Sequence, residues 1–192
     1  MKKLLIIASL AGCIFAGEMG LSAYGGLGLA NISYEADTPD GVTYGMKPGL
    51  NIGVQYNKLP VLVSAGISMR GSVMSMDGVD DKTTTSMNYL DISVLYPYAV
   101  GPGNVFAGLD IGINLSAKMK SDASGAEEVD MTETSDDKAM CHDKDGKGMS
   151  CMNGLDYGLL VGYTYPINET MGVSAGYYLG LADWSGDGGA SE

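Results

Sequence analysis

Residue types on which most catalytic and metal sites depend are scarce in this sequence. Its 192 residues include one histidine and three cysteines, and no Cys/His spacing typical of a metal site is present. The histidine, His142, lies in a polar stretch beside Asp143, where a solvated side chain is expected rather than a catalytic base held by a rigid scaffold. We therefore expect no catalytic residue, no metal site and no cofactor.

Long apolar runs and positive charge are also missing. Outside the N-terminus no apolar run reaches about 18 residues, which excludes a membrane-spanning helix. The net charge is −12, which excludes nucleic acid as a partner because a phosphate backbone requires basic side chains. Phenylalanine occurs only twice, whereas the sequence contains 29 glycines and 12 tyrosines.

What the sequence does contain is a two-residue alternation of apolar and polar side chains. In residues 105–118, the apolar positions are Leu109, Ile111, Ile113, Leu115 and Ala117, and the positions between them are Asp110, Gly112, Asn114 and Ser116. Because successive side chains of a strand point to opposite faces, this pattern predicts one apolar and one polar face. The same pattern predicts further strands at residues 19–34, 44–56, 61–74, 87–98, 154–165 and 171–184.

The connections distinguish a soluble sandwich from a membrane barrel. Long polar loops are predicted at residues 35–43, 75–86 and 121–153, and they alternate with short turns after the other strands. Outer-membrane barrels combine short periplasmic turns with long extracellular loops, whereas a soluble sandwich has no reason to sort its loops by length. Tyrosines near the predicted strand ends, Tyr34, Tyr44, Tyr56, Tyr89, Tyr96, Tyr98, Tyr163 and Tyr165, fit interfacial girdles; ordinary tyrosine enrichment in strands is the alternative.

Charged side chains on the predicted polar faces have mixed signs. Arg70, Asp91, Asp110 and Asp156 are expected to form an ion-pair network in the lumen, because unpaired charges there would be costly. Such a network predicts a plugged lumen, since about eight strands leave room only for side chains. Lys47 and Lys118 fall on the same faces; the alternative for these two is a position in water near the strand ends.

The N-terminus resembles an export signal. Residues 1–16 begin with Lys2 and Lys3 and continue with a short apolar and small-residue segment, so residues 17–192 would form the mature domain. An alternative is a lipoprotein cleavage box ending at Cys13. In an oxidising compartment Cys141 and Cys151 are expected to form a disulfide, with two unpaired loop thiols as the alternative.

Several segments resemble the small outer-membrane β-barrel domain family (porin-like, PorT-like). The similarity lies in residues 88–92, 107–112, 115–119 and 176–181, and it covers about three quarters of the chain. The resemblance implies an all-β, eight-stranded, up-and-down antiparallel barrel in a Gram-negative outer membrane, without shared catalytic residues. Ser93 stands where that family usually has proline. No eighth strand is predicted after Trp184, where the chain reads as a loop, and we therefore expect a sequence that is C-terminally incomplete.

These observations predict a non-enzymatic outer-membrane barrel that acts in envelope integrity or in surface contact through long acidic loops. A narrow pore or transport component is the first alternative, and a soluble exported β-domain is the second. The expected partners are outer-membrane lipid, the barrel-assembly machinery during insertion, and a surface ligand whose identity the sequence does not indicate.

Overall fold

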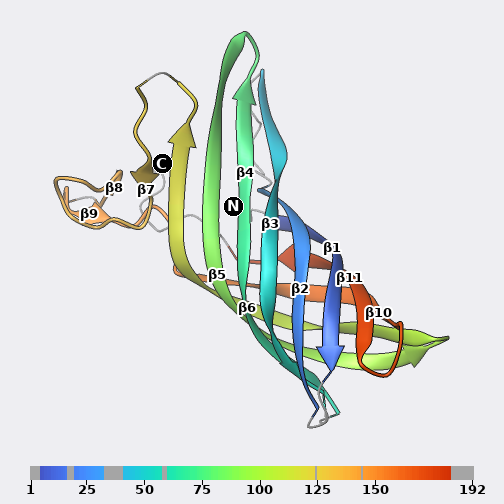
Figure 1. The fold of residues 1–192 in the computed structure, drawn as a ribbon. Coiled ribbons are helices and arrows are strands. Elements are labelled where there is room, and N and C mark those ends of the chain that lie inside the picture. Colours follow the sequence, from blue (N-terminus) through green and yellow to red (C-terminus); the bar gives the residue numbers. More distant parts are fainter. Residues whose placement is uncertain are drawn as a thin grey trace.

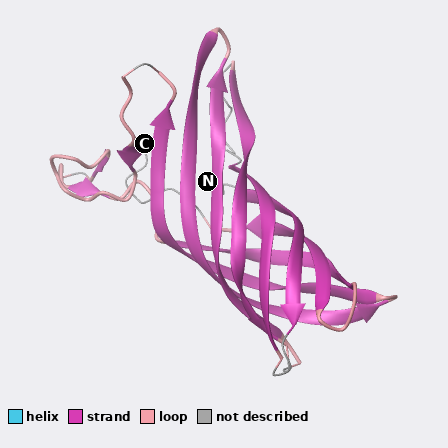
Figure 2. Ribbon diagram, in the orientation of Figure 1, coloured by secondary structure: helices cyan, strands magenta, loops and turns pink. Residues whose placement is uncertain are grey.

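The computed structural model describes residues 5–16, 20–32, 41–57, 60–123, 125–143 and 145–182. Eight long strands form the barrel in the described part of the chain (Figures 1 and 2). They are β1 (Leu5–Ala16), β2 (Leu21–Ile32), β3 (Val42–Tyr56), β4 (Leu62–Met76), β5 (Val79–Val100), β6 (Gly103–Ser121), β10 (Leu155–Pro166) and β11 (Met171–Gly180). The two-residue strands β7 (Val129–Asp130), β8 (Cys141–His142) and β9 (Gly148–Met149) lie between β6 and β10.

The long strands form a closed ring. Each pairs antiparallel with its neighbour in the order β10-β11-β1-β2-β3-β4-β5-β6, and a further pairing of β10 with β6 closes the sheet. In that last pairing Leu159 lies opposite Leu109. Closure gives every long strand two partners, which satisfies the backbone groups that a bilayer cannot hydrate. The predicted all-β, up-and-down antiparallel architecture is confirmed.

The eighth position is occupied by β1. This strand pairs with β11 on one side and β2 on the other, with Ala8 opposite both Tyr177 and Leu29. The sequence assigns residues 1–16 to a signal peptide, and its removal on export stays a prediction. With only the seven predicted strands, the edges of β2 and β11 would lack partners. In the uncleaved chain β1 lies between them and pairs with both edges.

The two ends of the barrel differ in their connections. At the short-turn end lie the turns β3–β4, β5–β6 and β10–β11; at the long-loop end lie the connections β2–β3, β4–β5 and β6–β10. β3, β4, β5 and β6 extend past the remaining strands at the long-loop end (Figure 1). The predicted loop at residues 75–86 is wrong, since β4 and β5 continue through it and turn at Asp77 and Gly78. Gly78 has a φ of 80°, the left-handed conformation that an Asp-Gly hairpin turn requires.

The barrel exposes its apolar side chains and buries its polar ones. Leu109 is 59% exposed, whereas its neighbour Asp110 is 4% exposed. The same outward apolar row continues around the wall at Leu27, Leu50, Ile52, Val54, Ile92, Val94, Ile111, Leu155, Leu159 and Val161. Tyr56, Tyr96, Tyr98 and Tyr165 are exposed towards the short-turn end, where an interfacial girdle is expected. Of the predicted girdle, Tyr34 lies outside the described residues.

Within the described residues, no helix is long and apolar enough to cross a bilayer.

Candidate functional site

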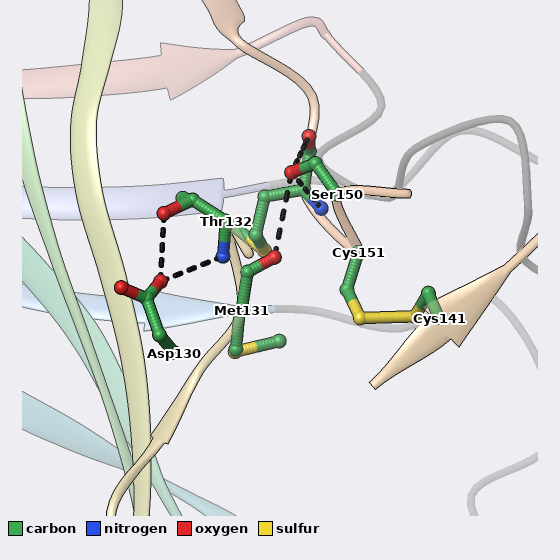
Figure 3. The surroundings of a disulfide bond; sticks show 7 residues. Asp130, Met131, Thr132, Cys141, Ser150 and Cys151 are labelled. Carbon is green, nitrogen blue, oxygen red and sulfur yellow. Dashed lines mark hydrogen bonds between the residues drawn. A yellow bond between two sulfur atoms is a disulfide. The ribbon is translucent and has the colours of Figure 1, made fainter. Parts of the chain in front are cut away.

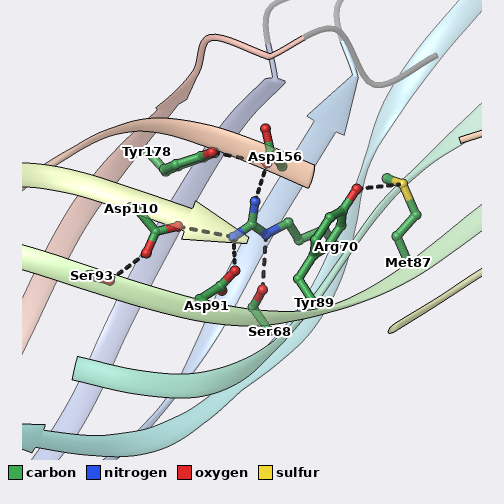
Figure 4. Close-up of polar contacts among 9 residues, drawn as sticks. All are labelled: Ser68, Arg70, Met87, Tyr89, Asp91, Ser93, Asp110, Asp156 and Tyr178. Carbon is green, nitrogen blue, oxygen red and sulfur yellow. Dashed lines mark hydrogen bonds and ion pairs between the residues drawn. The ribbon is translucent and has the colours of Figure 1, made fainter. Parts of the chain in front are cut away.

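The most extensive polar site is a cluster around Arg70 on β4, inside the barrel (Figure 4). The guanidinium donates from Nη1 to Asp156 Oδ2 on β10 and from Nη2 to Asp91 Oδ1 on β5, both at 2.5 Å. A longer contact of 3.4 Å joins Nη2 to Asp110 Oδ2 on β6. The structure thus brings together the four residues of the predicted lumen network, which are Arg70, Asp91, Asp110 and Asp156.

Two tyrosine rings complete the surroundings of the guanidinium. The Arg70 Cζ atom lies 4.7 Å from the ring centroid of Tyr89 and 4.7 Å from that of Tyr178. The Tyr178 hydroxyl donates to Asp156 Oδ2 at 3.0 Å, and Arg70 Nε donates to Ser68 Oγ at 3.0 Å. These contacts hold a side chain that is only 3% exposed, and they satisfy three of its donor groups in a water-poor lumen.

Glycines on the lumen wall make room for these large side chains. A Cβ atom on Gly158 would lie 2.7 Å from the Tyr178 ring, and one on Gly112 would lie 2.9 Å from Asp91 Oδ1. Real Cβ atoms do not approach so closely, so a larger residue at Gly158 would overlap backbone and ring, and one at Gly112 would displace the Asp91 carboxylate from its place in the cluster. This explains part of the high glycine content.

Tyr89 corrects a sequence prediction. It was expected in an interfacial girdle, yet it is 2% exposed in the lumen. Tyr178 was not predicted as a site residue, although its place between the outward positions Tyr177 and Leu179 indicates an inward side chain. Lys118, by contrast, lies in water outside the lumen and pairs with Glu128 at 2.7 Å.

The connection between β6 and β10 covers the lumen at the long-loop end. Its residues Met131 and Met152 are buried in one cluster with Met87 and Ala117 of the barrel wall. The Met131 amide donates to the Ala117 carbonyl at 2.8 Å, and the Cys151 amide donates to the Met131 carbonyl at 2.9 Å. The same cluster includes Tyr89 and Tyr178, so these two methionines pack on the rings that flank Arg70.

The same connection contains the disulfide between Cys141 and Cys151 (Figure 3). Their Cα atoms are 5.3 Å apart, with a sequence separation of 10. Ser150 Oγ donates to the Met152 carbonyl at 2.9 Å, so the cross-linked segment is joined directly to the buried methionine. His142 lies beside this disulfide, and its Nε2 atom is 3.1 Å from the Asp136 carbonyl oxygen.

Acidic side chains are held in defined turns on this connection. Glu133 accepts hydrogen bonds from the Ser135 hydroxyl and from the Ser135 and Thr134 amides. These bonds lower the pKa of the Glu133 carboxyl, and the one from the Ser135 hydroxyl has the largest effect. The hydroxyl and then the amide of Thr132 lower the pKa of Asp130 in the same way. Among the described residues, no group of three or more His, Cys, Asp or Glu side chains is arranged to hold a metal ion.

The fold and the site define a closed antiparallel barrel with an apolar outer wall and a lumen crossed by charged side chains, which is the architecture of an outer-membrane β-barrel. Residues 15–186 match the sequence profile of the outer membrane protein beta-barrel domain, and the chain belongs to this family. Membership places the protein in the outer membrane. No curated protein and no solved structure shows a significant match to the chain.

Proposed function

We propose that this protein is a non-conducting, non-enzymatic barrel that stabilises the envelope and presents an acidic loop on the cell surface. The observation that carries the proposal is the Arg70 cluster. It joins β4, β5, β6 and β10 across the lumen through Arg70, Asp91, Asp110 and Asp156. We infer that these short ion pairs across the lumen interrupt the water path along its axis.

The cover at the long-loop end supports the same conclusion. Met131 and Met152 bury apolar side chains over the lumen, and a disulfide-linked segment is attached to them. Such a loop costs less entropy to keep ordered than a free loop of the same length. It is therefore suited to holding a defined surface for a partner.

The charge of that surface indicates the kind of contact. The β6–β10 connection carries acidic residues at Asp122, Glu127, Glu128, Asp130, Glu133, Asp136, Asp137, Asp143 and Asp145, whereas its basic residues are Lys138, Lys144 and Lys147. A surface with this imbalance attracts cationic partners and repels anionic ones. The further partners that we propose are outer-membrane lipid around the apolar wall and the barrel-assembly machinery during insertion.

A planar-bilayer experiment tests the proposal. The refolded full chain should give no discrete conductance steps, whereas the variant Arg70→Ala, which removes the cation that joins the strands, should give small or unstable ones. Regular steps from the unsubstituted protein would contradict a plugged lumen. They would favour the narrow-pore alternative, which the cavities on the short-turn side of the cluster support.

A soluble exported domain is the remaining alternative. It predicts a compact monomer without detergent. The outward apolar row from Leu109 to Leu115 instead predicts aggregation when detergent is removed, so size-exclusion chromatography with and without detergent distinguishes the two.

A further inference from the structure

The lumen is hollow on the short-turn side of the Arg70 cluster. One cavity of about 160 Å³ begins at the cluster itself, and another of about 340 Å³ lies at the short-turn end. Gln55, Leu62, Phe106 and Thr164 line both cavities, so the two adjoin. Together they form a pocket that opens at the short-turn end and is closed at Arg70, and its size is in the range of small-molecule sites.

The polar lining of the outer cavity is mostly uncharged. Its carboxamides come from Gln55, Asn57, Asn104 and Asn168, its hydroxyls from Ser22, Thr164 and Thr170, and its charge from Glu169. Carboxamides both donate and accept hydrogen bonds, so this lining matches a neutral ligand that carries hydroxyl and amide groups. With a carboxylate and no basic side chain among the described lining residues, the cavity does not favour anions.

One group in this cavity lacks a partner. Ser22 is 2% exposed, and its Oγ atom makes no hydrogen bond with protein atoms. Leaving a buried hydroxyl unpaired costs free energy that a ligand hydroxyl or carbonyl would recover. Ser22 lines the outer cavity, but its Oγ atom is itself buried, so a ligand there would supply this bond once the hydroxyl rotates towards the cavity.

An apolar surface faces the same space. The Phe106 ring lies directly over Gly162, where any Cβ atom would overlap it, so the position of the ring is set by the wall behind it. Phe106, Leu62 and Met171 supply carbon surface beside the carboxamides. A ligand for this site therefore needs one apolar face as well as hydrogen-bonding groups, and a pyranose ring with an acetamido group has both.

We propose that the short-turn end of the barrel binds a neutral N-acetylated sugar unit of the cell-wall glycan, which enters from the periplasm. Short turns mark the periplasmic end of outer-membrane barrels, so the pocket opens towards the compartment that contains this glycan. The ring packs on Phe106, and its hydroxyl and acetamido groups bond to Gln55, Asn104 and Ser22. This binding is independent of the surface loop and of conductance, and it would attach the barrel to the cell wall.

Titration calorimetry of the refolded full chain in detergent micelles, with N,N′-diacetylchitobiose as the probe, tests this proposal. We expect saturable binding, weakened about tenfold by Phe106→Leu and by Gln55→Leu, because each loses about 1.4 kcal/mol of contact. The control Thr84→Val, on the β5 extension at the other end of the barrel, should bind as the unsubstituted protein does. Heat-modifiable migration on gels verifies that every variant is folded.

Three results would overturn the proposal. The first is the absence of a heat signal with the unsubstituted protein. The second is binding of the disaccharide that Phe106→Leu and Gln55→Leu leave unchanged, since this would place it elsewhere or on the micelle. The third is equal affinity for a sulfated sugar of the same size, which would contradict the preference for a neutral ligand.

Discussion

Replacing Arg70 by methionine tests how much the lumen cluster contributes to stability. The substitution removes a cation that is 3% exposed, and it leaves Asp91 and Asp156, each bonded to it at 2.5 Å, without a partner. Removing one side of a buried ion pair costs about 3–5 kcal/mol. Losing the contacts with the Tyr89 and Tyr178 rings adds about 1 kcal/mol. We expect the free energy of unfolding to fall by about 4–6 kcal/mol.

The three carboxylates should not contribute equally. Asp156 is 2.5 Å from the guanidinium and also accepts from Tyr178, whereas Asp110 is 3.4 Å away. We expect Asp156→Asn to cost about 2–3 kcal/mol, as for a hydrogen bond between charged groups. Asp110→Asn should cost less than about 1 kcal/mol, because one guanidinium faces three carboxylates and removing the most distant one relieves repulsion.

Urea unfolding in detergent micelles, followed by circular dichroism and by gel migration, measures these differences. The matched control combines Arg70→Met with asparagine at all three aspartates, which removes the unpaired charges and should recover most of the lost stability. A loss below about 1 kcal/mol for Arg70→Met, or no recovery in the combined variant, would show that water solvates the cluster. A plugged lumen would then be contradicted.

Three further predictions concern the wall and the loop. Ile111→Arg places a cation on the lipid-facing side and should destabilise the barrel by about 2–4 kcal/mol in lipid; an unchanged unfolding midpoint would place this face away from lipid. Cys141→Ser should loosen the loop alone, with a loss of about 2–3 kcal/mol in the chain-entropy model; labelling of Cys141 and Cys151 by an alkylating agent without reductant would refute the bond. Because hydrogen bonds from Ser135 lower the pKa of Glu133, they stabilise the turn at neutral pH and are lost as pH falls through that depressed pKa. Amide exchange at Ser135 should therefore accelerate in acid beyond its intrinsic rate, and Glu133→Gln should abolish this dependence.

Most of the barrel wall follows from local sequence. The alternation in residues 105–114 places Leu109 and Ile111 outward and Asp110 inward, as the structure has them, because side-chain direction in a regular strand follows parity. The same prediction is wrong for Ala117, which is buried, and for Lys118, which is exposed, because the pairing of β5 with β6 skips Leu115 and reverses the parity beyond it. The inward placement of Arg70, Asp91, Asp110 and Asp156 followed from the same rule. Their gathering in one cluster also required the register between β4, β5, β6 and β10, and only the closed sheet sets that register.

Other features depend on contacts between distant segments. Thr83, Thr84 and Thr85 look like loop residues because they are polar, yet pairing with β4 and β6 keeps them in a strand. Tyr89 was expected at the interface because it is a tyrosine near a strand end, yet it has the same parity as the inward Asp91, so the local alternation alone would have placed it in the lumen.

The sequence by itself determined the all-β architecture and which side chains share a face, because a two-residue alternation is a local property of the chain, and its sorting of long loops from short turns favoured an outer-membrane barrel. Tertiary structure decided which segment completes the barrel and how the lumen is closed. Residues of β1 carry no alternation that marks them as a barrel strand, and they occupy the eighth position because β2 and β11 each present unpaired backbone groups. Such pairing depends on backbone hydrogen bonds, which every residue except proline can donate, so composition does not reveal it.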